Sequence, residues 1–376
     1  MNKDLKYEFA DFAQQPLELP TPGIPPVHDF KDRELDGMHA LTEYIKTVAG
    51  APPELQRLAH PREMLGGLKS IIILAIPNHM TGPRSFEQSR SQLRGAMSAT
   101  HVSVALQKRM TRVHAAVTSF FKDRGFVCRP LPPNAPLKIF AARGGIGFYA
   151  KNSMIITKEH GSWVSLSGYA TDALLEPDNP LAGDCGDCEL CLQACPAGAL
   201  NQPYSCITHN CINFQLQSKN VIPEAMRPLL KNGLAYGACR VCRDVCPHNK
   251  ELIPFDDPAL NADTLNPDLL EFLDLDEEHW NLEFAATRMG AIMQHRRFVI
   301  RNALIALANF GDSRALDRIA RELDNDDPLL REYAAWALGS IGGPDVHTCL
   351  QEALPRETCE PVRQAIQAAL KKQSNL

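Results

Sequence analysis

Apolar positions divide the chain into segments with different periodicities. Residues 70–76 (SIIILAI) form a continuous apolar run rich in β-branched side chains, which predicts a strand covered on both faces. Residues 101–121 carry apolar side chains at helical spacing and predict an amphipathic helix. Further strands are expected at 153–157 and 163–166. We therefore expect an α+β fold for residues 1–180, an α/β-type domain suited to binding a cofactor.

The start of the chain reads differently. Prolines crowd residues 16–26, where neither a helix nor a central strand can continue. We expect a loop there, and then a helix at 38–47 ahead of the main fold.

The last part of the chain repeats itself. Residues 303–312 (ALIALANFGD) are echoed at 334–343 (AAWALGSIGG), a period of 31 residues, and more weakly at 365–370 (AIQAAL). Helix pairs repeated at such a period bury their apolar faces against their neighbours. We therefore predict a HEAT-like α-solenoid over residues 290–376, preceded by connecting helices at 253–289. A plain helical bundle is the alternative.

Charge and composition narrow the setting. A formal net charge of −5 over 376 residues provides no strong basic field, so nucleic acid would have to be held by a local patch. The first residues lack the apolar stretch of a secretion signal, and no run of about 18 apolar residues occurs. We expect a cytoplasmic monomer that does not contact a membrane.

Nine of the twelve cysteines lie in residues 185–246, and clustered thiols in a large chain without a secretion signal usually hold metal. The run CxxCxxCxxxCP at 185–196 matches bacterial ferredoxins, in which three thiolates bind one [4Fe–4S] cluster and the fourth binds the other. A second run, CxxCxxxCP, covers residues 239–247. With one linker thiolate, residues 181–252 form a ferredoxin-like module for two [4Fe–4S] clusters. The crossed assignment gives cluster 1 Cys185, Cys188, Cys191 and Cys246, and gives cluster 2 Cys195, Cys239, Cys242 and a linker cysteine.

Spacing alone leaves two alternatives open. Zinc also uses CxxC pairs, but a tetrahedral zinc site needs only two pairs and leaves the third close cysteine and both Cys-Pro steps unexplained. The linker ligand is either Cys206 or Cys211. The isolated cysteines Cys128, Cys349 and Cys359 are expected to be packing residues.

Several segments recur in a known family. Residues 211–214 (CINF), 222–230 (IPEAMRPLL) and 236–239 (YGAC) are similar, in the same order, to the CISY, IPEELRPL and YGC segments of the epoxyqueuosine reductases. Residues 142–153 (ARGGIGFYAKNS), 301–303 and 335–338 also resemble segments of this family. The chain more distantly resembles the reductive dehalogenases. The resemblance selects Cys211 as the eighth ligand and leaves Cys206 spare.

The resemblance implies a second cofactor, cobalamin. Glycines in residues 144–153 would let the backbone approach a large planar ligand, and the polar residues beside them offer donors to its periphery. An ordinary glycine-rich turn is the alternative. We expect the cofactor-binding residues to be Arg57, His101, Gly144, Gly145, Gly147, Lys151, Asn152 and Ser153.

The implied activity is that of a cobalamin- and iron–sulfur-dependent reductase. Electrons would pass from a ferredoxin or flavodoxin through two [4Fe–4S] clusters to cobalamin and then to a substrate, as in the reduction of epoxyqueuosine to queuosine in tRNA. In one alternative, the same cofactors serve a small molecule or another corrinoid protein. In a second, the chain is a non-catalytic iron–sulfur carrier or scaffold.

Two departures from the family pattern concern the proton. Pro133 stands where the family has its acidic aspartate, and the family's Asp-Tyr-His is reduced to residues 99–101 (ATH). A proline cannot donate a proton, so another group or water must do so. We expect His101 or Tyr149 to be the catalytic acid. His101 would donate when protonated, and a phenolate at Tyr149 would be stabilised by Lys151; packing roles for both are the alternative.

Overall fold

The computed structural model describes residues 3–28, 67–80, 92–132 and 135–373. The chain forms two compact units. The first contains residues 1–81, 105–211 and 241–256, and the second contains residues 82–104, 212–240 and 257–376. The chain therefore passes between the units several times, and the linear boundaries expected at 180, 252 and 289 stay a prediction. The helix predicted at 38–47 lies outside the described residues.

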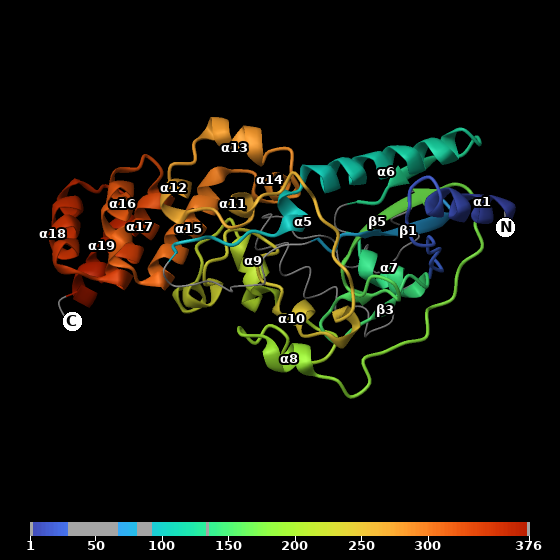
Figure 1. Cartoon of the computed structure of the whole chain (residues 1–376), viewed down its shortest axis with the longest axis horizontal. Helices are drawn as coiled ribbons and strands as arrows, with labels where there is room; N and C mark the ends of the chain where they lie inside the picture. Colours follow the sequence, from blue (N-terminus) through green and yellow to red (C-terminus); the bar gives the residue numbers. More distant parts are fainter. Residues whose placement is uncertain (1–2, 29–66, 81–91, 133–134, 374–376) are drawn as a thin grey trace. The chain divides into compact units, whose positions relative to one another are not determined.

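The first unit is built on a three-stranded antiparallel sheet in the order β1-β5-β2 (Figure 1). Strand β1 (Ser70–Pro77) is the predicted apolar run and pairs along its whole length with β5 (Val164–Thr171). Strand β2 (Cys128–Pro130), which the apolar pattern did not indicate, also pairs with β5. The antiparallel arrangement supports the α+β description.

Both faces of β1 are covered. Its even-numbered residues from 72 to 76 pack against α1 (Lys3–Gln14) and α6 (Val104–Lys122). Its odd-numbered residues from 71 to 75 pack against α7 (Leu137–Arg143) and a small hairpin of β3 (Phe148–Tyr149) and β4 (Ile155–Ile156). The alternation follows from the pleat of a strand, and it confirms the prediction of two buried faces.

The helix predicted over residues 101–121 is interrupted, which corrects that expectation. Helix α5 (Ala99–Val102) ends before Ser103, which has an extended backbone (φ −69°, ψ 113°), and α6 then begins at Val104. The Ser103 hydroxyl donates to Asp257 Oδ2 at 2.5 Å. Apolar spacing continues through Ser103, so periodicity could not reveal the break; serine side chains often bond outside a helix. The strand expected at 153–157 shortens to β4, and the one at 163–166 lengthens to β5.

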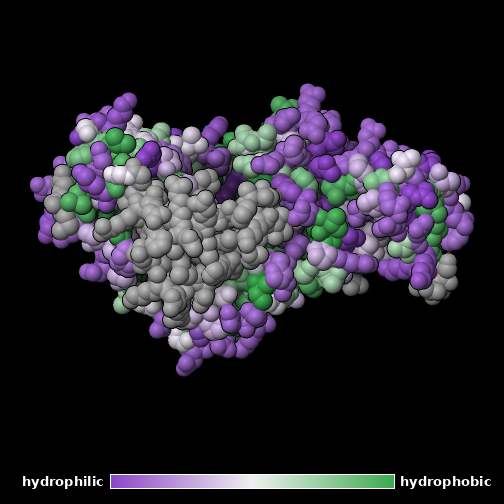
Figure 2. Space-filling model, turned by 180° about the vertical axis from the view of Figure 1, so that it is seen from behind, coloured by the Kyte–Doolittle hydropathy of each residue, from purple (hydrophilic) through white to green (hydrophobic). Residues whose placement is uncertain are grey.

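The second unit contains the helical repeats (Figure 1). Helix α17 (Pro328–Ile341) lies between α15 (Arg296–Phe310) and α19 (Glu360–Gln373), with α16 (Leu316–Arg321) and α18 (Pro344–Ala353) as connecting members. Helix α15 is enclosed from 298 to 308 because α12 (Leu269–Phe272), α14 (Arg288–Met293) and α17 pack around it. On the face in Figure 2, the repeat end is mainly hydrophilic. Within the described residues, the second unit also contains α9 (Ile212–Leu216), α11 (Ala262–Leu265) and α13 (Glu277–Glu283). The short helices α8 (Leu190–Ala194) and α10 (Val241–Asp244) belong to the first unit.

Two buried polar residues tie α15 to the segment after α9. Arg301 is fully buried and donates to Ser218 O (2.8 Å) and to Asn302 Oδ1 (3.0 Å). The Asn302 amide donates to the carbonyls of Leu216 (2.8 Å) and Leu234 (2.7 Å). A buried charge is tolerated only when its donors are satisfied, so these bonds fix residues 216–234 against the first repeat helix.

Among the described residues, no helix is both long and apolar enough to cross a membrane.

Candidate iron–sulfur site

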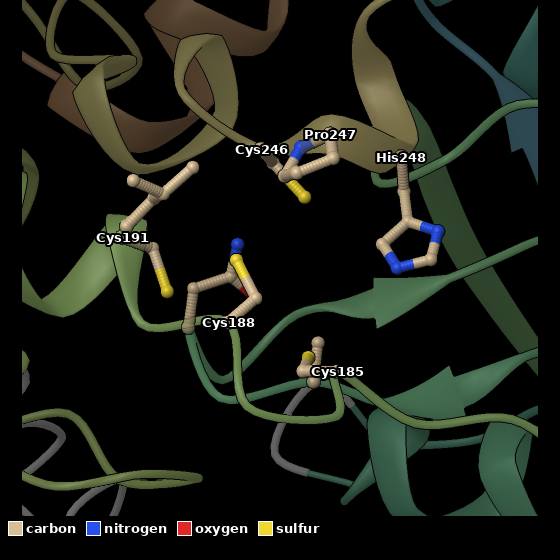
Figure 3. A pocket seen from close by; sticks show the side chains of 9 residues that line it. Cys185, Cys188, Cys191, Cys246, Pro247 and His248 are labelled. Atoms are coloured by element: carbon tan, nitrogen blue, oxygen red, sulfur yellow. The ribbon is translucent and has the colours of Figure 1, made fainter.

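Four cysteines of the first unit line one pocket. Cys185 and Cys188 come from the loop that leads into α8, Cys191 lies in the first turn of α8, and Cys246 follows α10. Figure 3 shows their sulfur atoms gathered around the same space. That space measures about 360 Å³, including its part open to solvent. Four thiolates around one pocket form the ligand set that a [4Fe–4S] cluster takes, and they are the set predicted for cluster 1.

The thiols of this pocket affect one another's ionisation. Burial raises the pKa of Cys191 to about 11, together with the charges of Cys185 and Cys246. Burial also raises the pKa of Cys246, as do the charges of Cys185 and Cys188. Neighbouring thiolates repel, so their joint deprotonation requires compensating positive charge, and the iron ions of a cluster supply it.

A single metal ion and an iron–sulfur cluster make different demands on their ligands. Among the residues that the structure describes, no three His, Cys, Asp or Glu side chains converge closely enough to hold a single metal ion. A [4Fe–4S] cluster presents four separate iron corners, so its thiolates surround a volume and need not meet at one point.

Residues 151–153 hold the cluster segments in place. The Lys151 N–H donates to Cys185 Sγ at 3.4 Å, and a bond of this kind to a ligand sulfur helps to set a cluster's potential. The Asn152 amide donates to the carbonyl of Cys242 at 3.2 Å. The Ser153 carbonyl accepts a hydrogen bond from Lys138 Nζ at 2.8 Å. These residues therefore support the cysteine loops, and their expected contact with cobalamin stays a prediction.

The glycines of this stretch have a packing role. Gly145 has a positive φ of 72°, and a Cβ there would come within 2.7 Å of the Asn179 carbonyl oxygen. At Gly147 a Cβ would collide with the carbonyl oxygen of Ile156 in the neighbouring strand. Close backbone packing accounts for both, as an ordinary glycine-rich turn would require. The predicted cofactor contacts of Gly144, Gly145 and Gly147 are untested by this geometry.

The cysteines predicted for cluster 2 belong to both units. Cys195, Cys211 and Cys242 lie in the first unit, and Cys239 lies in the second. The Cys206 thiol donates a hydrogen bond to Cys211, and this bond, burial and the charges of Cys211 and Cys242 raise the pKa of Cys206. Cys206 thus lies next to a predicted ligand, and the assignment of Cys211 stays a prediction.

Asn213 is a supporting residue that the sequence reasoning missed. Its Oδ1 accepts from the N–H groups of Gly237 (3.0 Å) and Cys239 (3.1 Å), and its amide donates to the Cys239 carbonyl (2.7 Å). One side chain thus fixes the backbone of a predicted ligand. Its position in the CINF segment, two residues after Cys211, was the available signal.

The histidine retained from the family's triplet is buried in the second unit. His101 Nδ1 lies 2.9 Å from Thr100 Oγ1 and 3.1 Å from Ser98 Oγ. Its ring meets Tyr236 edge-on, with centroids 5.1 Å apart. Gly237 has a φ of 91°, and a Cβ there would come within 2.6 Å of His101 Nδ1. Tyr236 and Gly237 of the YGAC segment therefore pack directly against the His101 ring.

The other proton-donor candidate, Tyr149, lies on β3 in the first unit, whereas His101 belongs to the second. Burial raises the pKa of Tyr149, although the nearby Ser153 side chain opposes the shift. The phenol therefore keeps its proton at neutral pH, as a donor must. Arg57 and Pro133 lie outside the described residues.

Comparison with known families confirms two of the predicted modules. Residues 184–249 match the family described as the 4Fe-4S double cluster binding domain. Residues 296–371 match the HEAT repeats. The chain therefore carries a module for two [4Fe–4S] clusters, as its cysteine spacing predicted, and a HEAT-repeat tail.

Several similar proteins are epoxyqueuosine reductases. The epoxyqueuosine reductase of Bacillus anthracis is 31% identical over 317 residues, covering 82% of each chain. That of Bacillus subtilis strain 168 is 32% identical over 332 residues, covering 85% of this chain and 83% of the relative. A solved epoxyqueuosine reductase with an epoxyqueuosine-modified tRNA-Tyr stem loop gives a TM-score of 0.87 at 28% identity, over 99% of both chains. A catabolic reductive dehalogenase gives only 0.37 at 14% identity, too low to carry an argument.

We predict about eight iron and eight sulfide per chain, because eight cysteines form two cluster sets. Iron and sulfide assays on anaerobically purified protein, with the visible absorption spectrum, measure this. Cys188→Ser should lose about half of the iron, since Cys188 lines the cluster 1 pocket. The control Cys349→Ser, a half-buried cysteine of α18, should lose none. Stoichiometric zinc without sulfide-to-iron absorption would contradict the assignment.

The choice between Cys206 and Cys211 is tested by paired serine variants. Cys206→Ser should keep both clusters, because the resemblance selects Cys211 as the ligand and leaves Cys206 spare. Cys211→Ser should lose or convert one cluster, visible as a fall in iron content and a changed electron paramagnetic resonance (EPR) signal. The reverse pattern would make Cys206 the ligand.

Proposed function

The chain belongs to the epoxyqueuosine reductase family, and from this we propose that it reduces epoxyqueuosine to queuosine in tRNA. Membership makes the chain an oxidoreductase. The observation that carries the proposal is the pocket lined by Cys185, Cys188, Cys191 and Cys246, within a chain that matches a tRNA-bound reductase over 99% of its length. That pocket provides electron delivery, and the resemblance supplies the substrate.

Cobalamin, on which the family's chemistry depends, is the cofactor that we propose next to the clusters. When bound, it supplies a cobalt centre that passes electrons to the substrate. One feature of the first unit fits such a ligand. The buried Ser153 hydroxyl has no well-formed hydrogen bond within the described part of the chain. The Tyr149 phenol lies near it, since the Ser153 side chain lowers the pKa of that phenol. Buried hydroxyls normally have a partner, and an amide on the rim of a corrinoid would provide one.

We propose that the chain's own residues bind this cofactor and protonate the substrate. We assign Lys151, Asn152 and Ser153 with Arg57, His101 and the glycines of 144–147 to cofactor binding, as the resemblance implies. Tyr149 is the preferred acid, since its burial keeps the phenol protonated. Electrons would enter from a ferredoxin or flavodoxin at cluster 1, because the loop around Cys185 and Cys188 is exposed at residues 181–184 and 186–187. A tRNA substrate places the protein in the cytoplasm, where we expect it to act as a monomer.

A second candidate function rests on the two departures. Pro133 replaces the family's acid, and residues 99–101 keep only its histidine. Both changes affect the groups that would deliver a proton to the substrate, and both leave every predicted cluster ligand in place. The same cofactors would then reduce another substrate, either a small molecule or another corrinoid protein.

The substrate is tested by complementation. Expressed in a strain that lacks its own epoxyqueuosine reductase, the chain should restore queuosine in tRNA, measured by mass spectrometry of nucleosides. The Cys188→Ser variant should fail, because cluster 1 loses a ligand. Epoxyqueuosine that persists beside fully loaded clusters would favour the second candidate. A gain of activity in Pro133→Asp would then show that only the family's acid was missing.

The proton donor is tested by Tyr149→Phe and His101→Ala. The variant that lacks the acid should lose turnover by about 10²- to 10⁴-fold, the usual contribution of a general acid. Cluster and corrinoid absorption should stay as in the wild type, which separates a lost proton from a lost cofactor. Equal turnover in both variants would show that water supplies the proton and that the two residues are structural.

A further inference from the structure

Lys138 is a charged residue whose role the family resemblance did not assign. It lies in the first turn of α7, and its ammonium donates to the Ser153 carbonyl at 2.8 Å. Burial lowers the pKa of the Lys138 ammonium, and the charge of Arg243 adds to this effect. The charges of Cys206, Cys211 and Cys242 act in the opposite direction and favour the ammonium. Lys138 is therefore a basic side chain, held by the Ser153 carbonyl, that interacts electrostatically with the second cysteine set.

From this placement we propose that Lys138 raises the reduction potential of cluster 2 and so sets how readily that cluster accepts an electron. The proposal rests on the proposed function, since Cys211 and Cys242 are cluster 2 ligands in it. Lys138 would act through the cluster and would not touch the substrate.

The direction follows from charge. A [4Fe–4S] cluster becomes more negative by one unit when it takes up an electron, and net charge nearby is one of the factors that set its potential. A positive charge stabilises the reduced state more than the oxidised state, so the potential rises. Solvent reaches part of the Lys138 side chain although protein atoms surround its ammonium, so screening limits the effect to a smaller shift than a fully enclosed charge would cause.

The geometry also fixes the position of the charge. The Lys138 ammonium is held next to Ser153 by its hydrogen bond to the Ser153 carbonyl, and Ser153 has a left-handed backbone with a φ of 59°. The neighbouring Asn152 donates to the carbonyl of Cys242. Two hydrogen bonds, from Lys138 to the Ser153 carbonyl and from Asn152 to the Cys242 carbonyl, therefore connect Lys138 to a predicted ligand. All of these residues lie in the first unit.

The test is a potentiometric titration of the anaerobically purified full-length chain, followed by EPR. It requires neither tRNA nor cobalamin, so a wrong substrate would not affect it. We expect Lys138→Met and Lys138→Gln to keep about eight iron and to shift one of the two midpoints to a more negative value. Lys138→Arg, which keeps the charge, should stay near the wild type. The control Lys122→Met, at the exposed end of α6, should change neither midpoint.

Three outcomes would overturn the proposal. In the first, both midpoints are unchanged in Lys138→Met and Lys138→Gln. In the second, Lys138→Arg shifts a midpoint as far as Lys138→Met, which would make side-chain shape and not charge the cause. In the third, both neutral variants lose iron, which would make Lys138 a requirement for holding the cluster.

Discussion

The repulsion between closely spaced thiolates is the constraint on which this structure depends. The burial and mutual charge that raise the pKa of Cys191 to about 11 would keep the thiols protonated without metal. Iron removes that cost only if the sulfur atoms are already near their positions. The cysteine segments contain little regular structure, with α8, α9 and α10 each five residues or shorter. Their order must therefore come from residues outside them.

Each unit supplies that order through side chains that bind backbone. In the first unit, Asn152 holds the carbonyl of Cys242. In the second unit, Asn213 holds both backbone groups of Cys239, and Asn302 holds carbonyls at both ends of the segment from Leu216 to Leu234. Asparagine suits this task because one amide offers both a donor and an acceptor. The first repeat helix thus serves the cluster module as well as the repeat stack.

Features carried by local spacing were predictable from sequence. Cysteine intervals predicted the double-cluster module, the period of 31 predicted the repeats, and the apolar run predicted β1. Features that depend on a single tertiary contact were not. The break at Ser103 interrupts no apolar pattern, and Asn213 has no signature until the chain brings it to Cys239. The close backbone packing of Gly145 and Gly147 against the carbonyls of Asn179 and Ile156 likewise depends on tertiary neighbours that the sequence pattern does not reveal.

The departures that the resemblance indicates concern proton delivery and not electron delivery. Electron delivery depends on thiolates in fixed places, where one changed ligand removes a cluster, and every predicted ligand is a cysteine. Proton delivery is more tolerant, because a phenol, an imidazole or water can replace a carboxylic acid if its pKa suits the operating pH. Burial keeps the Tyr149 phenol protonated in the first unit. If Pro133 replaces the family's acid, as the resemblance implies, the electron path through the cysteines is unaffected. Divergence within such a family should therefore appear first among the groups that meet the substrate.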